Sequence, residues 1–377
     1  MIETNDTNLI VEFIKIARPS STHLNEDEYK IKKTNSFNCW KIDSGKLIKV
    51  QSEHVGIIFD EECYIVQWRF DLQLDNHVAE KMLIYYWSGQ NAVKASCPLP
   101  PDVDKDFPVD RLTQWSEIPL FFHGFQRKCI MLNGKESDFN GVKPHLFIIR
   151  GEHPDDIHLY EVPCETPSLR SRTSFLLVNP RMSVFIYWHG YSAIEEYKDY
   201  IKACAPHNLL KTWQKDWINF SISECWEGQE PKAFKDALGP FLYDINSAVN
   251  MEIHRHWTPK LYYLNNVCGD FTSTEVEYPL KLPNKVSPYP FLQSHLYTAL
   301  KSAFFLLDNY YDIWLWENIS QLNDDSQTMQ KMSRDFLNNY HKEKTQKCNI
   351  DIKVSIVEAY KEPQEFKQLF PQWRDRH

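Results

Sequence analysis

The chain has 377 residues, 42% of them hydrophobic and 14% aromatic, including 12 Trp. A single core seldom grows beyond about 250–300 residues, so this length predicts two or three domains. The net charge of −9 disfavours nucleic acid as a partner, because such binding needs a basic surface. There are 11 Gly and no GxGxxG or GxxxxGK[ST] pattern, which argues against nucleotide-binding loops.

Cysteine usage and hydropathy point to the compartment. The nine cysteines are an odd number and lie far apart without a CxxC pair, which is typical of buried thiols in a reducing environment. No apolar run approaches the roughly 18 residues of a membrane span, and the N-terminus does not resemble a signal peptide. We therefore expect a soluble cytoplasmic protein without a transmembrane segment.

The first 34 residues form an N-terminal extension that contains one apolar run, LIVEFIKIA, at positions 9–17. This run fits either an added strand or the remnant of a preceding domain. The sequence leaves both interpretations open.

A domain-sized repeat follows the extension. Three aromatic strands end at Trp87, Trp188 and Trp316, which lie 101 and 128 residues apart. Two β-rich runs precede each Trp strand, and a segment carrying Glu, then Pro, then Phe follows it, at 117–125, 228–239 and 361–370. The common order is strand, strand, Trp strand, helix, and a strand leading into the Pro-Phe segment. This order predicts an α+β architecture, with mixed sheets covered by helices.

The helix position differs between the repeats. In the second and third repeats, apolar residues recur with helical spacing and so predict a helix. They are Ile194, Tyr197, Ile201 and Cys204 in the second repeat, and Met329, Met332, Phe336 and Tyr340 in the third. In the first repeat the same position, 91–112, contains four prolines. Proline interrupts helical hydrogen bonding, so we expect a loop with at most one turn there.

With these anchors in register, the chain resembles gelsolin-like repeats of the gelsolin/villin family. The motifs that carry the resemblance are SLRSRTSFLLVNPRMSVFIYWHG (168–190), GDFTSTEVEYP (269–279), PFLQSHLYTALKSAFFLLDNYYDIWLWE (290–317) and EPQEFKQLFPQWRDR (362–376). The resemblance is stronger over 145–377 than over 35–135. It implies tandem repeats, each a mixed five-stranded sheet between a long and a short helix. The expected boundaries are 35–136, 143–240 and 259–377, with a linker at 241–258.

The resemblance also implies a function. Members of this family act on the actin cytoskeleton without being enzymes, so the expected partners are actin and other cytoskeletal proteins. Association with the inner face of the plasma membrane is expected to be peripheral and to run through those partners. The sequence ends at His377, so we expect no villin headpiece in this chain.

Calcium is the ion to test, because gelsolin-like repeats hold it between a Gly-Asp pair near a strand and a glutamate of the long helix. Oxygen ligands of this kind suit a hard cation. Glu61-Glu62 stands in this position in the first repeat and Arg172-Thr173 in the second. Gly269 and Asp270 are the remaining calcium candidate in the third. We expect calcium-independent repeats without a cofactor.

Partner-contact candidates are the apolar positions of the two predicted helices, namely Ile194, Tyr197, Ile201, Met329, Met332 and Phe336. The same stripes also fit a role in the core. No arrangement of residues frames a nucleophile, so no catalytic residue is predicted. Two functions remain open: a protein that binds actin filaments or their associated partners without calcium control or severing, and an interaction scaffold that has lost direct actin binding.

Overall fold

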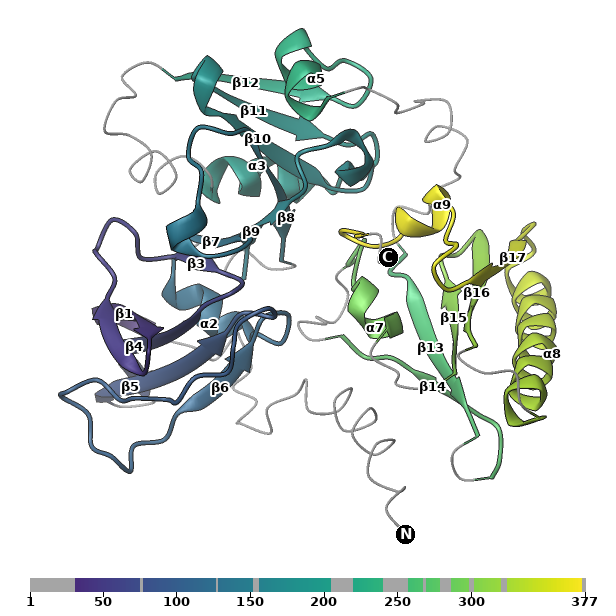
Figure 1. Ribbon diagram of the computed structural model, residues 1–377, viewed down its shortest axis with the longest axis horizontal. Coiled ribbons are helices and arrows are strands. Elements are labelled where there is room, and N and C mark those ends of the chain that lie inside the picture. The colour runs from purple at the N-terminus through teal and green to yellow at the C-terminus, as the bar shows by residue number, and fades with distance from the viewer. Residues whose placement is uncertain are drawn as a thin grey trace.

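A computed structural model describes residues 31–374, except 75–76, 127, 152–155, 205–219, 240–256, 267–268, 279–285, 298–301 and 320–323. The described chain contains three β-sheets with helices packed on their faces (Figure 1). None of the helices in these ranges is long and apolar enough to cross a membrane. Most of the N-terminal extension and of the linker at 241–258 lies outside the described residues.

The three sheets repeat one strand order. The first runs β2 (Lys46–Lys49), β1 (Ile31–Asp43), β4 (Cys63–Leu74), β5 (His77–Ser88), β6 (Asp110–Thr113). The second contains β12 (Ser221–Trp226), β11 (Val184–His189), β10 (Ser174–Asn179), β8 (His145–Arg150), β9 (His158–Val162), β7 (Cys129–Leu132), β3 (Ile57–Phe59). The third runs β14 (Thr272–Glu275), β13 (Lys260–Asn265), β15 (Ala303–Asp308), β16 (Asp312–Asn318), β17 (Lys353–Glu358). In each, the Trp strand pairs antiparallel with the strand before it and parallel with the strand after it.

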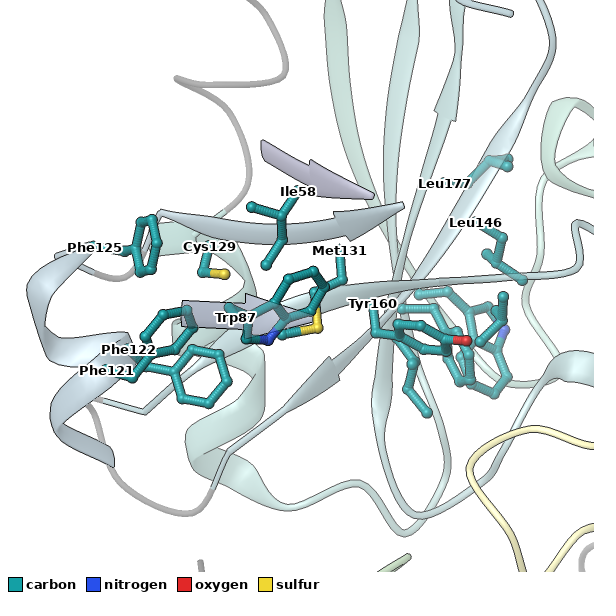
Figure 2. Close-up of a cluster of buried hydrophobic side chains, with 14 of the residues drawn as sticks. Ile58, Trp87, Phe121, Phe122, Phe125, Cys129, Met131, Leu146, Tyr160 and Leu177 are labelled. Atoms are coloured by element: carbon teal, nitrogen blue, oxygen red, sulfur yellow. The ribbon is translucent and has the colours of Figure 1, made fainter. Parts of the chain in front are cut away.

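This arrangement confirms the α+β class and the mixed sheets. The expectation of five strands is met in the first and third sheets but not in the second, which has seven. The two additional strands come from the first repeat: β7 pairs parallel with β9, and β3 pairs parallel with β7. The core is continuous across this junction, since Trp87 and Phe121 belong to the same buried cluster as Leu146 and Tyr160 (Figure 2).

One face of each sheet is covered by the element that follows the Trp strand. Helix α3 (Glu195–Cys204) covers this face in the second repeat and α8 (Asp324–Cys348) covers it in the third. In the first repeat residues 91–109 form a loop without a helix, as the prolines predict. Its apolar side chains, including Leu99, Val103 and Phe107, pack on the sheet in place of a helix.

The opposite face is covered by the short helices α2 (Pro119–Gly124), α5 (Lys232–Leu238) and α9 (Gln364–Lys367). Smaller elements are α7 (Gln293–Tyr297) and the 3₁₀ turns Glu136–Asp138, Thr166–Ser168 and Pro180–Met182. In α5 and α9 the proline of the Glu-Pro motif is the N-cap, and in α2 Pro119 occupies the first turn. Proline suits these positions because the N–H that it lacks has no partner within the helix.

Each central tryptophan is tied to the glutamate that precedes its short helix. The indole Nε1 donates to the carboxylate Oε1 at 2.7 Å in Trp87–Glu117, 3.0 Å in Trp188–Glu230 and 2.9 Å in Trp316–Glu362. All three indoles are 0% exposed. A buried indole N–H needs an acceptor, and the glutamate before each short helix supplies one.

We predict that Trp188→Phe lowers the free energy of unfolding by about 2–4 kcal/mol, because it opens space in the core and removes the donor to buried Glu230. The matched control is Trp226→Phe on the edge strand of the same sheet, where the side chain is 43% exposed; its effect should stay within about 0.5 kcal/mol. Chemical denaturation monitored by circular dichroism gives both values. Equal losses in the two variants would contradict the role assigned to the Trp–Glu bond.

Candidate ion and partner sites

Strands β4, β10 and β15 occupy equivalent positions in the three sheets. Tyr64, Phe175 and Phe305, near the starts of these strands, each lie opposite the central tryptophan of their repeat. The loops that precede β4 and β10 pack tightly against the end of the Trp strand, since a Cβ on Gly89 or Gly190 would lie 2.2 Å from the carbonyl oxygen of Asp60 or Ser171. The backbone thus forces glycine there, and the resemblance places the calcium position in these loops.

In the first repeat the carboxylates of this loop are held by protein groups. Glu62 accepts from the Tyr64 hydroxyl at 2.5 Å and from the Glu136 N–H at 3.2 Å, and it lies 3.6 Å from Lys41 Nζ. Asp60 accepts from Asn91 Nδ2 at 2.8 Å and from the Gly134 N–H at 2.6 Å. These donors take up the oxygen atoms that a cation would need.

In the second repeat the loop carries Arg172, which reaches across to the end of the linker and to the third repeat. Its Nη2 donates to the carbonyl oxygen of Trp257 at 2.6 Å and its Nη1 to that of Pro288 at 3.4 Å. Its backbone N–H donates to the Tyr289 hydroxyl at 3.1 Å. The Arg172 side chain is buried, and its guanidinium group is directed at carbonyl oxygens. A fixed positive charge therefore lies in the loop where the resemblance places a metal ion.

Arg170 makes a second set of contacts across the same junction and was not singled out by the sequence. It is 2% exposed, and its Nε donates to the carbonyl oxygen of Phe370 at 2.7 Å. Its Nη1 donates to the carbonyl of Pro167 at 2.6 Å, which fixes the guanidinium against its own loop. A pair of arginines directly before a buried strand is the sequence signal that could have identified it.

The calcium candidate of the third repeat, Gly269 and Asp270, stays a prediction, and its position in the sheet differs from that of the other two pairs. Gly269 and Asp270 lie in the connection between β13 and β14, whereas the position equivalent to Arg172-Thr173 directly precedes β15. The Gly-Asp pair matched the family motif in composition but not in its place in the sheet. Among the described residues, no group of three or more His, Cys, Asp or Glu side chains is arranged to hold a metal ion.

The residue after the central tryptophan ties the long helix to the sheet. In the second repeat His189 Nε2 lies 2.8 Å from Glu224 Oε1, which also bonds Lys202 of α3 at 2.8 Å. In the third repeat Glu317 accepts from Arg334 Nε of α8 at 2.9 Å. These bonds fix helix to strand in both repeats.

His189 also contacts Ser174, giving a Ser–His–Glu arrangement. Ser174 Oγ lies 2.8 Å from His189 Nδ1, and both residues are 0% exposed. Burial lowers the pKa of His189, which opposes the effect of the Glu224 carboxylate. A serine enclosed in a central strand cannot reach a substrate, so the geometry supports a structural role.

Most of the predicted partner-contact residues lie in the core. Ile194, Tyr197 and Ile201 pack on the second sheet, and Met329 and Phe336 pack on the third. Tyr197, Ile201 and Met329 are buried and cannot offer a surface to a partner, because helix-face periodicity does not distinguish core from interface. Met332 is the exception, with 39% of its surface exposed.

A cavity of about 60 Å³ lies where the three repeats meet. Glu117 of the first repeat, Arg150 and His158 of the second, and Tyr289 and His295 of the third line it. Burial lowers the pKa of His158 to about 3 and that of His295 to about 4. Burial raises the pKa of Glu117 to about 7, against the effects of the Trp87 hydrogen bond and the Arg150 charge.

The chain matches no family model. It is 27% identical to Bos taurus supervillin over 383 residues, covering 90% of this chain and 17% of that protein. Mus musculus advillin is 27% identical over 251 residues (63% of this chain, 29% of that protein), and Drosophila melanogaster gelsolin is 24% identical over 241 residues (63% and 26%). The chain therefore spans less than a third of each of these relatives.

Among solved structures, the Thorarchaeota 2DGel3/rabbit actin complex shares 19% identity and covers 54% of this chain and 100% of its own, at a TM-score of 0.21. The sequence matches support membership of the gelsolin/villin family. Within that family the relationship is supervillin-like, as the motifs at 168–190 and 290–317 predict.

Glu117 gives a pH-dependent prediction. Its folded pKa of about 7 lies above the ordinary value of 4.5, so folding favours the protonated form. The stability that it contributes is complete below about pH 4.5 and is lost as the pH rises through 7. The side chain of Glu117→Gln stays neutral at every pH. The free energy of unfolding of this variant, relative to that of the wild type, should therefore be roughly 2–3 kcal/mol higher at pH 8 than at pH 5. Denaturant unfolding at both pH values measures this gain, and a pH-independent difference would contradict it.

Proposed function

We propose that this chain is a non-enzymatic, actin-filament-binding part of a cytoskeletal protein. The observation that carries the proposal is the threefold gelsolin-like repeat, with its Trp–Glu bond in each unit, together with similarity to supervillin over 90% of the chain. The resemblance to the gelsolin/villin family implies actin as the partner. A cytoskeletal location, reaching the inner face of the plasma membrane through partners, follows from the same resemblance.

Binding without calcium control or severing is the second part of the proposal. Its support is the chemistry of the loops, where Arg172 is directed at carbonyl oxygens and Glu62 is held by protein donors. A guanidinium next to the metal position repels a divalent cation. In the third repeat the Gly269-Asp270 pair lies in the connection between β13 and β14, away from the start of β15.

The alternative is an interaction scaffold without direct actin contact. Two observations favour it: the first repeat has a loop where the other repeats have a long helix, and the apolar stripes of α3 and α8 are largely used in the core. Affinity capture dominated by proteins other than actin would support this alternative.

Co-sedimentation with filamentous actin tests the proposal. We expect the chain to pellet with filaments equally in calcium and in a calcium chelator, and to leave the depolymerisation rate of diluted pyrene-labelled filaments unchanged. Pelleting that depends on calcium would contradict calcium independence, and accelerated depolymerisation would contradict the absence of severing. No pelleting in either condition would remove direct actin binding.

A matched pair of variants locates the contact on α8. Met332→Asp places a charge on the exposed apolar residue of this helix, and Asn338→Asp places the same charge on another exposed position. If α8 meets the filament through Met332, the first variant should lose at least several-fold in affinity and the second should not. Equal binding by both variants would exclude this helix face while leaving filament binding intact.

A further inference from the structure

The three sheets end in equivalent edge strands. In the described part of the chain, β6, β12 and β17 each lie at the end of their sheet and pair parallel with the Trp strand (Figure 1). The Lys353 N–H of β17 donates to the carbonyl oxygen of Tyr311, so the backbone groups of Lys353 and Ser355 are directed at β16. The N–H and C=O groups of Val354 and Ile356 are therefore directed at the open edge.

The side chains at these two outward positions are apolar. Val354 lies beside Ile313 and Ile356 lies beside Leu315, and both neighbours belong to the buried cluster under α8. Val354 is nevertheless 37% exposed and Ile356 is 47% exposed. The edge of the third sheet therefore presents apolar surface where one more strand would cover it.

The charged residues at the two ends of β17 are held by groups of the same chain. Lys353 Nζ lies 5.9 Å from the centroid of the Trp314 ring, on the face opposite to α8. Glu358 forms an ion pair with Lys361 at 2.5 Å. The four residues between Lys353 and Glu358 read Val-Ser-Ile-Val and carry no charge. The middle of this edge thus lacks the charged side chains by which natural edge strands prevent pairing.

The equivalent edges of the other two sheets are protected by polar or charged residues. In β6 the outward positions hold Arg111 and Thr113. In β12 the outward residues are Ile222, Glu224 and Trp226. Glu224 stands where β17 has its isoleucine, one residue before the position opposite the central tryptophan. A charge there opposes pairing between edges, and β17 is the strand of the three whose middle lacks it.

We propose that β17 pairs antiparallel with β17 of a second copy of this chain, across a twofold axis at Ser355. In this register Val354 of each copy lies opposite Ile356 of the other. Both residues have outward backbone groups, so each pair exchanges two hydrogen bonds. The four side chains lie on one face and shield one another from water, and a twofold contact of this kind closes after two copies. The same register in β12 would set Ile222 against Glu224, which favours β17 as the site.

The long helices leave space for this contact. Helix α8 packs on residues of β15 and β16, such as Leu306 and Leu315. Neighbouring strands lie about 4.8 Å apart, so a twofold axis beside β17 would separate the two copies of α8 by four strand spacings, or about 19 Å. A helix with its side chains is about 10–12 Å across. The two helices would therefore flank the apolar residues of the new strand pair without colliding.

Sedimentation equilibrium on the full chain tests the proposal. We expect a monomer–dimer equilibrium in the wild type and at least tenfold weaker dimerisation in Val354→Lys, which loses an apolar contact twice across the axis. Ile222→Lys is the matched control at the equivalent exposed position of β12 and should leave the dissociation constant unchanged. Far-UV circular dichroism and the unfolding midpoint verify that both variants are folded. A wild type that remains monomeric, or equal weakening by the two variants, would overturn the proposal.

A pair of opposite charges tests the register. Ile356→Glu should weaken self-association as Val354→Lys does, because each places a charge against an apolar residue. Mixing the two variants should restore dimers, since the lysine of one copy then lies opposite the glutamate of the other and the second pair remains apolar. A mixture that stays monomeric would overturn the proposed pairing.

Discussion

Each repeat depends on one buried hydrogen bond, from the indole of a central tryptophan to the glutamate before the short helix. The bond joins the middle of the sheet to the element that closes its face, so it sets where the helix begins. Proline then starts the helix and phenylalanine enters the core beside the indole, as Phe234 does beside Trp188. The opposite face tolerates more change, since a proline-rich loop replaces a helix there in the first repeat.

The repeats are joined in two different ways. The first and second share a sheet and a core, through β7 and β3. The second and third are joined by Arg170 and Arg172, whose guanidinium groups bond carbonyl oxygens across the junction. The carbonyl oxygen of Trp257 accepts from Arg172, and the centroid of the Trp257 ring lies 5.2 Å from Lys344 Nζ of α8. Lys344 forms a buried ion pair with Asp308, so the junction is connected to the long helix of the third repeat. Buried cations need hydrogen-bond or ion-pair partners. The planar guanidinium groups of the two arginines direct their N–H groups in fixed directions toward those partners.

The sequence predicted the parts that depend on local periodicity. The strands around Trp87, Trp188 and Trp316, the two long helices and the helix-free position at 91–112 all follow from spacing and proline chemistry. It did not predict the seven-stranded sheet, because the pairing of Cys129–Leu132 with β9 is a contact between repeats. The calcium candidate at Asp270 stays a prediction; the structure places it between β13 and β14, and a Gly-Asp pair in a sequence does not indicate which loop it occupies. The sequence did not show whether Tyr197 and Met329 lie in the core or on a partner-binding surface. The packing places both in the core. The repeat boundaries remain predictions.

Arg172 occupies, with a fixed charge, the position that the family resemblance gives to calcium. Small-angle X-ray scattering of the wild type and of Arg172→Ala, each with calcium and with a chelator, tests this directly. We expect one radius of gyration for the wild type in both conditions and a larger one for the variant, because its third repeat loses the anchor that Arg172 provides. Expansion of the wild type on adding calcium, or identical profiles for the two proteins, would contradict it.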